Sequence, residues 1–525
     1  MKKFKGFFVK GKPFFPLGAQ AHNSSSYSRE MFKESCIAAL ALNCNTVEAP
    51  IYWEIIEKQE GIFDFTCIDY MLELCRENDL KLILLWFASW KNGDMSFAPG
   101  WVKRDQQRFQ RVLRSDKTPV ANLSAHYTAN QEADAKAFAA VCSYLKETDG
   151  EKNTVIAVQV ENEPGYFKTD RDYSENALKN YKNTVPAGLL NYLSDHCEAP
   201  AYKDWEKYGK KQALSWEETF GFHGFEYCEA WHLAKYIDGV ALKGREKYNI
   251  PLYVNVWLND GTPWGVPGIE YPGGGAVIRT LHIWLAAMEN IDLIAPDIYE
   301  QNCYRFKEIC DFYNNDDNAL FIPESSRNIS NACNMFYAIA SGAAGYSSFG
   351  AESCIDNEGK VIDSAIPVRD SNLAVKNIMP LLLKHMNTGK IYPVVPYTDQ
   401  EDQGFEFEEF LGTVNFKDNY GFYDYRSRRY ITTQESRTSR GLIIEDEKRC
   451  FFLTGRFCLR LALKSSPEIS MIASQWHIPD FISIEEGHFD ESGNFITDCI
   501  RNGDEASFGG FWTAPECGIV RVKLL

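Results

Sequence analysis

The sequence predicts a (β/α)8 barrel, an α/β fold of the TIM type, followed by a smaller antiparallel β-sandwich domain. Over the first 389 residues, eight short apolar runs alternate with amphipathic helical stretches. Such runs are typical of parallel strands covered on both faces, and eight of them favour a closed barrel over an open doubly wound sheet. From about residue 391 the pattern changes to a period of two with turns, which predicts antiparallel strands. The predicted domains are therefore residues 1–389 and 390–525.

The predicted barrel strands follow one another at uneven spacing. In chain order they are Phe14–Ala19, Cys44–Glu48, Leu82–Trp86, Val155–Val160, Leu252–Val256, Asp292–Ala295, Ala319–Ile322 and Ala343–Ser348. The N-terminal letters MKKFKGFFVKGKPFF contain no long apolar core, so they predict a strand–turn–strand unit rather than a signal peptide. About 90 positions separate the fourth strand from the fifth. Long insertions after barrel strands lie on the catalytic face, so we expect this one at the rim of a substrate cleft.

Two predicted helices show the apolar spacing of a buried stripe. Ile68, Met71, Leu72 and Cys75 follow the i, i+3, i+4, i+7 pattern. A second stripe runs through residues 137–145 and is expected to end near Gly150, since glycine is a common helix terminator. Both helices are therefore expected to pack against the barrel sheet.

Composition excludes several classes of partner. The chain has 55 basic and 72 acidic residues, a formal net charge of −17, and such a surface repels nucleic acid and anionic lipid. No stretch approaches the roughly 20 apolar residues that span a bilayer. The 15 cysteines include no Cys-x-x-Cys pair, which favours buried thiols in a reducing compartment over a disulfide framework or a zinc site. We expect a cytoplasmic protein without nucleic-acid or membrane partners, and a homodimer is left open.

Acidic side chains follow two of the predicted strands directly. The fourth strand runs into Glu161-Asn162-Glu163, and the seventh runs into Glu324. The C-terminal ends of barrel strands carry catalytic groups, and one carboxyl group from each of two strands is the arrangement that cleaves glycosidic bonds. Glu161 and Glu163 share a face of a regular strand, so alternation leaves open which of them belongs to the pair. The alternative is that these acids are solvated loop residues or ion-pair partners.

Five motifs together resemble glycoside hydrolase family 35 of clan A, and in particular its bacterial β-galactosidase branch with a β-sandwich tail. They are FFPLGAQAHNSS, VEAPIYWEIIEKQEGIFDF, LLWFASWKNG, VQVENEPG and FIPES, and the resemblance covers about residues 4–352. It implies that Glu163 is the acid/base and that Glu324 is the nucleophile. It also implies that Asn162 binds the sugar 2-hydroxyl and that Tyr299 donates a hydrogen bond to the nucleophile. The implied activity is a retaining exo-β-galactosidase without metal or organic cofactor, acting on an oligosaccharide or another glycoside.

The sequence departs from the family pattern after the third strand. Where family members carry Cys-Ala-Glu-Trp, this chain has Phe87-Ala88-Ser89-Trp90, and Ser89 offers no carboxylate to galactose hydroxyls. We expect Glu54 or Asn92 to supply that contact instead. Trp90, Trp257 and Phe349 follow strand ends, where aromatic rings stack on sugar faces; packing inside the barrel is the alternative for the two tryptophans.

Three other functions remain open at this stage. Because of Ser89, the glycone specificity is open to β-fucosides, α-L-arabinopyranosides and β-glucosides. A metal-dependent barrel isomerase or hydrolase would use an all-carboxylate magnesium site. A catalytically silent sugar-binding protein has no need for a nucleophile and acid pair. For the tail we expect a structural domain packed on the barrel, and the alternative is a carbohydrate-binding module, suggested by Trp476 and Trp512.

Overall fold

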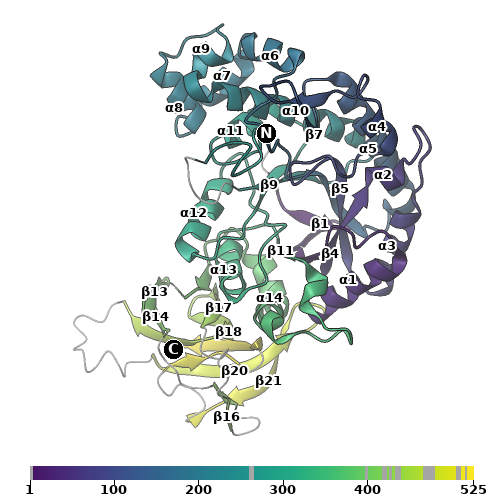
Figure 1. Cartoon of the computed structure of the whole chain (residues 1–525). Coiled ribbons are helices and arrows are strands. Elements are labelled where there is room, and N and C mark those ends of the chain that lie inside the picture. The colour runs from purple at the N-terminus through teal and green to yellow at the C-terminus, as the bar shows by residue number, and fades with distance from the viewer. Residues whose placement is uncertain are drawn as a thin grey trace.

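The barrel and the tail form two parts of one molecule. The computed structural model describes residues 4–258, 265–396, 400–416, 422–424, 429–431, 439–464, 479–503, 510–514 and 517–525. Figure 1 shows a parallel sheet surrounded by helices, with the C-terminal strands gathered at one end and helices α6 to α9 at the opposite end. Trp476 lies outside the described residues.

Seven parallel strands form a curved sheet in the order β10-β9-β8-β5-β4-β3-β11. They are β3 (Leu17–Gln20), β4 (Thr46–Tyr52), β5 (Lys81–Lys91), β8 (Val155–Asn162), β9 (Leu252–Trp257), β10 (Leu293–Asp297) and β11 (Tyr346–Phe349). Residues 319–325 fill the place between β10 and β11 through the parallel bridges Ile298–Ser325 and Ile322–Tyr346. The backbone N–H of Ile298 donates to the carbonyl of Glu324 at 2.9 Å. The predicted (β/α)8 barrel is therefore confirmed, with its seventh strand held by a few bridges rather than a continuous ladder.

An N-terminal hairpin and a cluster of large side chains fill the barrel. Strands β1 (Phe7–Val9) and β2 (Lys12–Phe14) pair in antiparallel fashion, as the sequence predicts. The Phe7 ring contacts that of Phe321 edge to face at 5.2 Å, and both belong to an interior cluster with Ile83, Leu85 and Tyr253. The barrel interior below the strand ends is therefore packed, which directs a ligand of the barrel to its C-terminal face.

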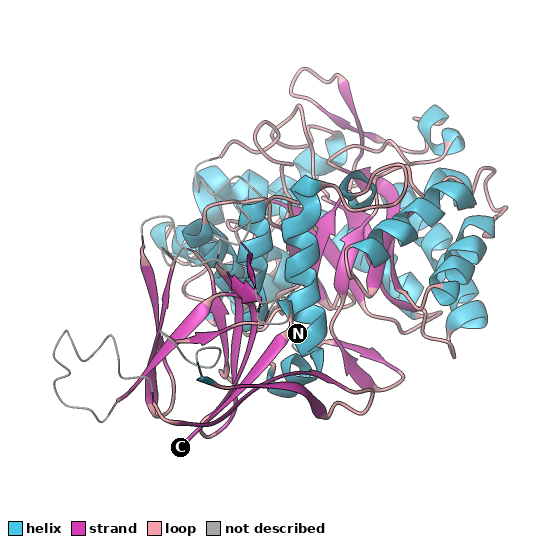
Figure 2. Ribbon diagram, turned by 90° about the horizontal axis from the view of Figure 1, so that it is seen from below, coloured by secondary structure: helices cyan, strands magenta, loops and turns pink. Residues whose placement is uncertain are grey.

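Helices cover the outside of the barrel sheet (Figure 2). The longer ones are α1 (Arg29–Ala41), α3 (Thr66–Glu77), α5 (Thr128–Asp149), α10 (Gly224–Arg245), α12 (Cys303–Tyr313), α13 (Ile329–Ala340) and α14 (Ile366–His385). The short elements are α2 (Trp53–Ile56), α4 (Gly100–Arg104), α11 (Leu281–Ala287), η1 (Gly221–His223), η2 (Ala351–Cys354) and η3 (Asp363–Ala365). The predicted stripe Ile68, Met71, Leu72 and Cys75 is buried in α3, and α5 ends at Gly150. Among the helices described, none combines the length and hydropathy needed to cross a bilayer.

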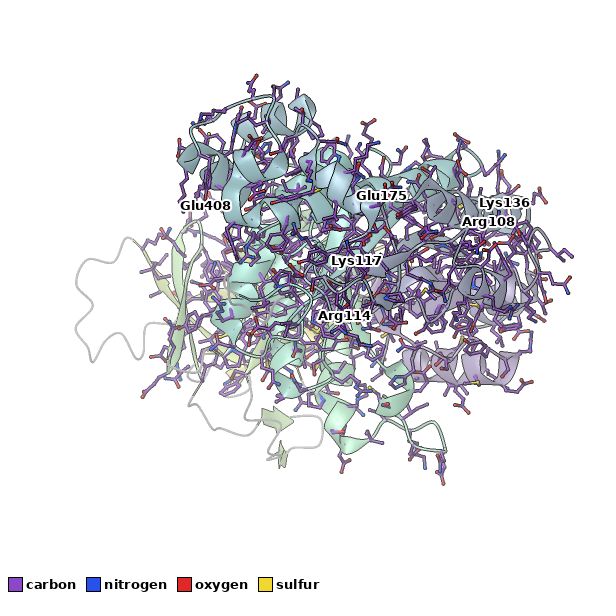
Figure 3. All side chains as sticks on the ribbon, turned by 45° about the horizontal axis from the view of Figure 1, so that its top comes forward. Arg108, Arg114, Lys117, Lys136, Glu175 and Glu408 are labelled. Atoms are coloured by element: carbon purple, nitrogen blue, oxygen red, sulfur yellow. The ribbon has the colours of Figure 1, made fainter. Side chains whose placement is uncertain are left out.

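The insertion between β8 and β9 is a separate helical layer. It contains α6 (Glu175–Lys182), α7 (Ala187–Ser194), α8 (Pro200–Lys207) and α9 (Trp216–Phe220), which pack on one another and on α10 and α11. The β6–β7 hairpin (Arg111–Leu113 and Pro119–Leu123) forms hydrogen bonds with the segment of the insertion that precedes α6. Arg114 Nε donates to the Lys168 carbonyl at 3.1 Å, and Lys117 Nζ donates to the Tyr173 carbonyl at 2.7 Å (Figure 3).

The tail consists of antiparallel sheets. Strands β12 (Ile391–Val394), β17 (Arg440–Glu447), β18 (Cys450–Arg456), β23 (Ile519–Leu524), β20 (Phe481–Phe489) and β21 (Phe495–Arg501) form one sheet in that order. A second contains β13 (Asp402–Glu406), β14 (Phe410–Asn415), β19 (Cys458–Leu463) and β22 (Phe511–Trp512), and β15 (Phe422–Asp424) pairs with β16 (Arg429–Ile431). The two larger sheets share an apolar core that includes Phe405, Phe451 and Leu459.

The tail packs directly on the barrel. Leu442, Ile444 and Phe452 of the large sheet belong to the same apolar core as the barrel helices. Arg440 Nε donates to Ser371 Oγ at 3.0 Å, and Thr454 Oγ1 donates to the Ala374 carbonyl at 3.3 Å, so β17 and β18 are also tied to α14. The expectation that the tail packs on the barrel is confirmed, and its structural role stays a prediction.

Candidate active site

A cavity of about 780 Å³ lies at the C-terminal ends of the barrel strands. Its lining comes from the ends of seven barrel strands and the loops that follow them. It includes Asn23, Lys91, Asn92, Glu163, Trp257, Leu258, Asp297, Tyr299, Glu300, Gln301, Glu324 and Phe349. Both predicted catalytic glutamates are thus on its wall. Apart from Glu163, the long insertion supplies none of these residues, so its helices do not form the cavity wall as expected.

The local backbone separates the two glutamates that alternation left ambiguous. Glu161 and Glu163 both adopt left-handed conformations, with φ of 64° and 46°. Non-glycine residues pay for that conformation with strain, and the regular strand alternation is broken. Glu161 is fully buried away from the cavity, where it accepts a hydrogen bond from the Trp90 backbone N–H at 2.7 Å. Glu163 points into the cavity.

Glu163 and Glu324 approach each other closely and are almost fully buried. Their side chains are 5% and 4% exposed. Together with Asp297, each offers a carboxylate oxygen, and these three oxygens lie within 4.8 Å of one another. Geometrically, the same three groups could hold a metal ion. A cluster of three carboxyl groups with so little exposure must carry protons or be balanced by cations.

Glu324 accepts three side-chain hydrogen bonds. Tyr299 Oη donates to its Oε2 at 2.9 Å, and the Nδ2 atoms of Asn162 and Asn255 each donate to its Oε1 at 3.4 Å. Donors of this kind stabilise the ionised form of a carboxyl group. Lys91 Nζ donates to Asn162 Oδ1 at 2.9 Å, which fixes the direction of the Asn162 amide.

Glu163 has the properties of a proton donor. Burial, together with the charge of Glu324, raises its pKa to about 7, while Lys91 and hydrogen bonds from Asp297 and Asn92 oppose that increase. Asn92 Nδ2 donates to Glu163 Oε2, and the backbone N–H of Glu163 donates to Asn255 Oδ1 at 2.9 Å. A carboxyl group with this pKa is available both as an acid and as a base near neutral pH.

Asp297 is the principal site residue that the sequence reasoning did not select. It is the last residue of β10, is 3% exposed, and accepts a hydrogen bond from Asn255 Nδ2 at 2.7 Å. Burial and the charges of Glu324 and Glu163 raise its pKa well above the usual value. The one signal in the sequence is its position two residues after the predicted sixth strand, Asp292–Ala295, ends.

Several predicted binding residues take the expected place, and others do not. Trp257 and Phe349 line the cavity beside Tyr299, while Asn162 lies just behind Glu324. Trp90 does not face the cavity as expected, because its fully buried ring packs edge to face on Tyr236 of α10 at 4.8 Å.

The expected replacements for a galactose-binding carboxylate also differ in position. Glu54 is absent from the cavity lining and accepts a hydrogen bond from Tyr27 Oη at 2.7 Å. Asn92 does line the cavity. Ser89 is fully buried, and its Oγ donates to Asp134 Oδ2 at 2.6 Å. Of the two replacements considered, only Asn92 therefore reaches the cavity.

Comparison with known proteins gives the family. Residues 6–266 match the model of glycosyl hydrolases family 35. The chain belongs to this family through these residues. Residues 374–512 match a second model, described as a domain of unknown function, DUF5597.

Curated relatives align with only part of this family 35 chain. A β-galactosidase of Xanthomonas manihotis is 28% identical over 196 residues, which cover 36% of this chain and 30% of the relative. Beta-galactosidase-1-like protein 3 of Rattus norvegicus is 29% identical over 192 residues, covering 35% of this chain and 28% of the relative. The chain thus spans less than a third of the length of these relatives.

One of the similar solved structures supports the fold. The catalytic domain of β-amylase from Paenibacillus polymyxa superposes with a TM-score of 0.50 at 11% identity, covering 68% of this chain and 97% of that domain. A β-galactosidase from the psychrophilic Marinomonas ef1 has a TM-score of 0.49 at 13% identity, covering 70% of this chain and 60% of its own. Identities this low speak for a shared architecture alone.

Proposed function

We propose that this chain is a retaining exo-glycosidase that removes terminal β-D-galactosyl residues. The observation that carries the proposal is the pair Glu163 and Glu324, whose carboxyl oxygens lie within 4.8 Å in one cavity. Retaining glycosidases hold their two carboxyl groups about 5–5.5 Å apart, whereas inverting enzymes need roughly 6.5–9.5 Å to admit a water molecule. The short separation supports retention.

In the first step, Glu324 is the nucleophile and Glu163 is the acid. An oxygen of Glu324 attacks the anomeric carbon while Glu163 protonates the glycosidic oxygen, so a glycosyl ester forms and the aglycone leaves as an alcohol. Tyr299 and Asn162 hold the attacking carboxylate in place. By resemblance to the family, Asn162 also binds the sugar 2-hydroxyl.

In the second step, Glu163 acts as the base. It accepts a proton from water, the resulting nucleophile attacks the anomeric carbon, and Glu324 leaves as a carboxylate. Glu163 ends the cycle protonated, so no proton is gained or lost by the enzyme. The chemistry needs two carboxyl groups and water, and we propose that it proceeds without a cofactor.

Galactose is the proposed glycone because the curated relatives are named beta-galactosidase or beta-galactosidase-1-like and because the family match covers the first five barrel strands. Trp257 and Phe349 offer ring faces to the sugar, and Asn92 offers an amide to its hydroxyls, since Ser89 carries no carboxylate. A panel of nitrophenyl glycosides tests this assignment. We expect the β-D-galactoside to have the highest kcat/KM; a β-fucoside, α-L-arabinopyranoside or β-glucoside in that place would change the sugar and keep the mechanism.

Two glutamine variants test the catalytic assignment. Glu324→Gln should abolish activity on every substrate, because an amide is not a nucleophile in this step. Glu161→Gln is the matched control, since Glu161 is equally buried but lies outside the cavity. Activity retained in Glu324→Gln, or lost equally in the two variants, would contradict the proposal.

One observation favours a second function, a metal-dependent reaction. Glu163, Asp297 and Glu324 offer three oxygens at mutual distances that a divalent cation bridges. Under that hypothesis the carboxyl groups would be ligands rather than acid and nucleophile, and activity would depend on added metal.

The organisation and location of the chain are proposals of the same kind. We propose a domain boundary between residues 389 and 390, supported by the end of α14 at His385 and the start of β12 at Ile391. We also propose a cytoplasmic location, supported by buried cysteines such as Cys142 and Cys310. A glycoside is the proposed partner, and no nucleic-acid or membrane partner is proposed.

A further inference from the structure

Three carboxyl groups converge in a site whose proposed reaction uses two. The third, Asp297, comes from β10 and lies within 4.8 Å of both Glu163 and Glu324, counted between one carboxylate oxygen of each. Any part that Asp297 plays in catalysis rests on the proposed glycosidase function, and it depends on whether this third acid carries a proton.

The amide of Asn255 ties the three acids into one arrangement. Its Nδ2 donates to Asp297 Oδ2 at 2.7 Å and to Glu324 Oε1 at 3.4 Å, while its Oδ1 accepts from the backbone N–H of Glu163 at 2.9 Å. Because both ends of this amide are engaged, its orientation is fixed and it faces Asp297 and Glu324 as a donor.

The remaining oxygen of Asp297 is buried without a donor. Among the described residues, no group donates a hydrogen bond to Asp297 Oδ1. One carboxyl oxygen of Asp297 lies within 4.8 Å of one of Glu163, and both side chains are almost fully buried. Two ionised carboxyl groups this close in a buried site repel each other, whereas a proton on one of them allows a hydrogen bond between the two. The arrangement therefore favours at least one proton on this pair.

The charges around Asp297 indicate where the protons lie. Glu324 accepts three hydrogen bonds, so it is the group best stabilised as an anion. Lys91 is the nearby cation, and its Nζ donates a hydrogen bond to Asn162 Oδ1 at 2.9 Å. The other titratable groups that face Asp297 are phenols with raised pKa values, namely Tyr253, Tyr299 and Tyr313. With Glu163 and Asp297 both protonated, the site holds one anion and one cation.

The same balance holds in the second half of the reaction. Once Glu324 has become a neutral ester and Glu163 has given its proton to the aglycone, Glu163 is the anion and Lys91 remains the cation. A neutral Asp297 then donates a hydrogen bond to the Glu163 carboxylate, where such bonds are strongest. An ionised Asp297 would instead place two adjacent anions in a buried site at that moment.

We propose that Asp297 is a positioning residue for the acid/base: it stays protonated through the catalytic cycle and donates a hydrogen bond to Glu163. This bond stabilises Glu163 as the base that activates water. It also keeps the basic limit of activity, which is set by Glu163, near neutral pH, where the group must gain and lose its proton in each cycle.

Two variants of Asp297 separate this role from a merely structural one. Asp297→Ala removes the donor, so kcat should fall tenfold or more through slower deglycosylation, and the glycosyl-enzyme should accumulate as a burst. The basic limit of the kcat/KM profile should move to higher pH by about one unit, because the Glu163 carboxylate loses a stabilising bond. Asp297→Asn keeps a neutral donor and should restore both kcat and the pH profile to within a few-fold of wild type.

Two results would overturn the proposal. If Asp297→Asn were as impaired as Asp297→Ala, or moved the basic limit to lower pH by a unit or more, Asp297 would be an ionised group. If Asp297→Ala had the kcat and the pH profile of wild type, the contact between Asp297 and Glu163 would have no effect on catalysis. Asp292→Asn is the matched control. Asp292 directly precedes β10 and is paired with Arg245, so this variant loses a carboxylate that does not line the cavity. Circular dichroism should show that all three variants are folded.

An infrared measurement tests the proton without any substrate. The difference spectrum of wild type minus Asp297→Asn near neutral pH should contain the carbonyl band of a protonated carboxylic acid. A carboxylate band in its place would refute the proposal even if the enzyme were a β-galactosidase. Conversely, if the wild type hydrolysed no glycoside, the proposed function would fail while this band still reported the state of Asp297.

Discussion

Glu163→Gln is the perturbation with the most specific consequences. An amide keeps the size of the side chain and its contact with Asn92 but gives no proton to a leaving group. Substrates with poor leaving groups should lose roughly 10²–10⁴-fold in kcat/KM, the usual contribution of a general acid. Substrates with good leaving groups depart without a proton, so their first step should be nearly unchanged. Their second step lacks a base, and the glycosyl-enzyme should accumulate.

The pKa of Glu163 gives the expected pH dependence in magnitude and sign. The acid must be protonated at the start of the cycle, so activity is present below its pKa of about 7 and is lost above it. The protonated fraction falls from roughly nine-tenths at pH 6 to roughly one-tenth at pH 8, so kcat/KM should drop about tenfold over that interval. In Glu163→Gln this basic limit should disappear.

The assay compares a dinitrophenyl galactoside with an alkyl galactoside, each with and without azide. Azide attacks the glycosyl-enzyme without help from a base, so it should accelerate turnover of the dinitrophenyl substrate in Glu163→Gln and give a galactosyl azide. Glu161→Gln, two positions away along the chain, should keep the leaving-group dependence and basic limit of wild type. Equal losses on both substrates in Glu163→Gln, with no response to azide, would refute the assignment of Glu163.

Three other perturbations have defined expected outcomes. Tyr299→Phe removes one donor from Glu324, and loss of a hydrogen bond to a charged group, about 1.5–3 kcal/mol, should lower kcat/KM by roughly 10- to 150-fold, as steady-state kinetics would show. Exhaustive chelation should leave activity unchanged, whereas a loss that magnesium or manganese restores would favour the metal-dependent alternative. Residues 391–525 expressed alone should be insoluble, because β17 and β18 leave their apolar contacts with α14; a stable fragment that binds sugar in a pull-down would contradict the docked view.

The fold was predictable from the sequence because burial on both faces leaves a direct signature. Apolar runs such as 155–160 have few alternatives to a parallel strand once helical stripes separate them. The seventh strand shows the limit of this signal. Its apolar letters were recognised, but its sparse bridges to Ile298 and Tyr346 depend on how the barrel closes, which no local pattern contains.

Site residues were predictable from the sequence where they directly follow a regular strand. They were not predictable where the backbone departs from a regular strand. Glu161 and Glu163 have left-handed backbone conformations, so strand alternation does not predict which of them faces the cavity. Only the resemblance to the family identified Glu163 as the acid/base. Trp90 turned out to pack on Tyr236 because β5 continues to Lys91, beyond the predicted end, and carries the ring toward α10. Asp297 was missed because one acid among 72 is not distinctive until its two neighbours are placed in space.

The stereochemistry of the first product tests the central claim most directly. Hydrolysis of an aryl β-D-galactoside is followed by proton NMR, and the anomeric signals are recorded before mutarotation mixes them. Double displacement through Glu324 predicts that the β-anomer of galactose appears first, because two inversions restore the original configuration. First appearance of the α-anomer would show a single displacement and would contradict the roles assigned to Glu163 and Glu324.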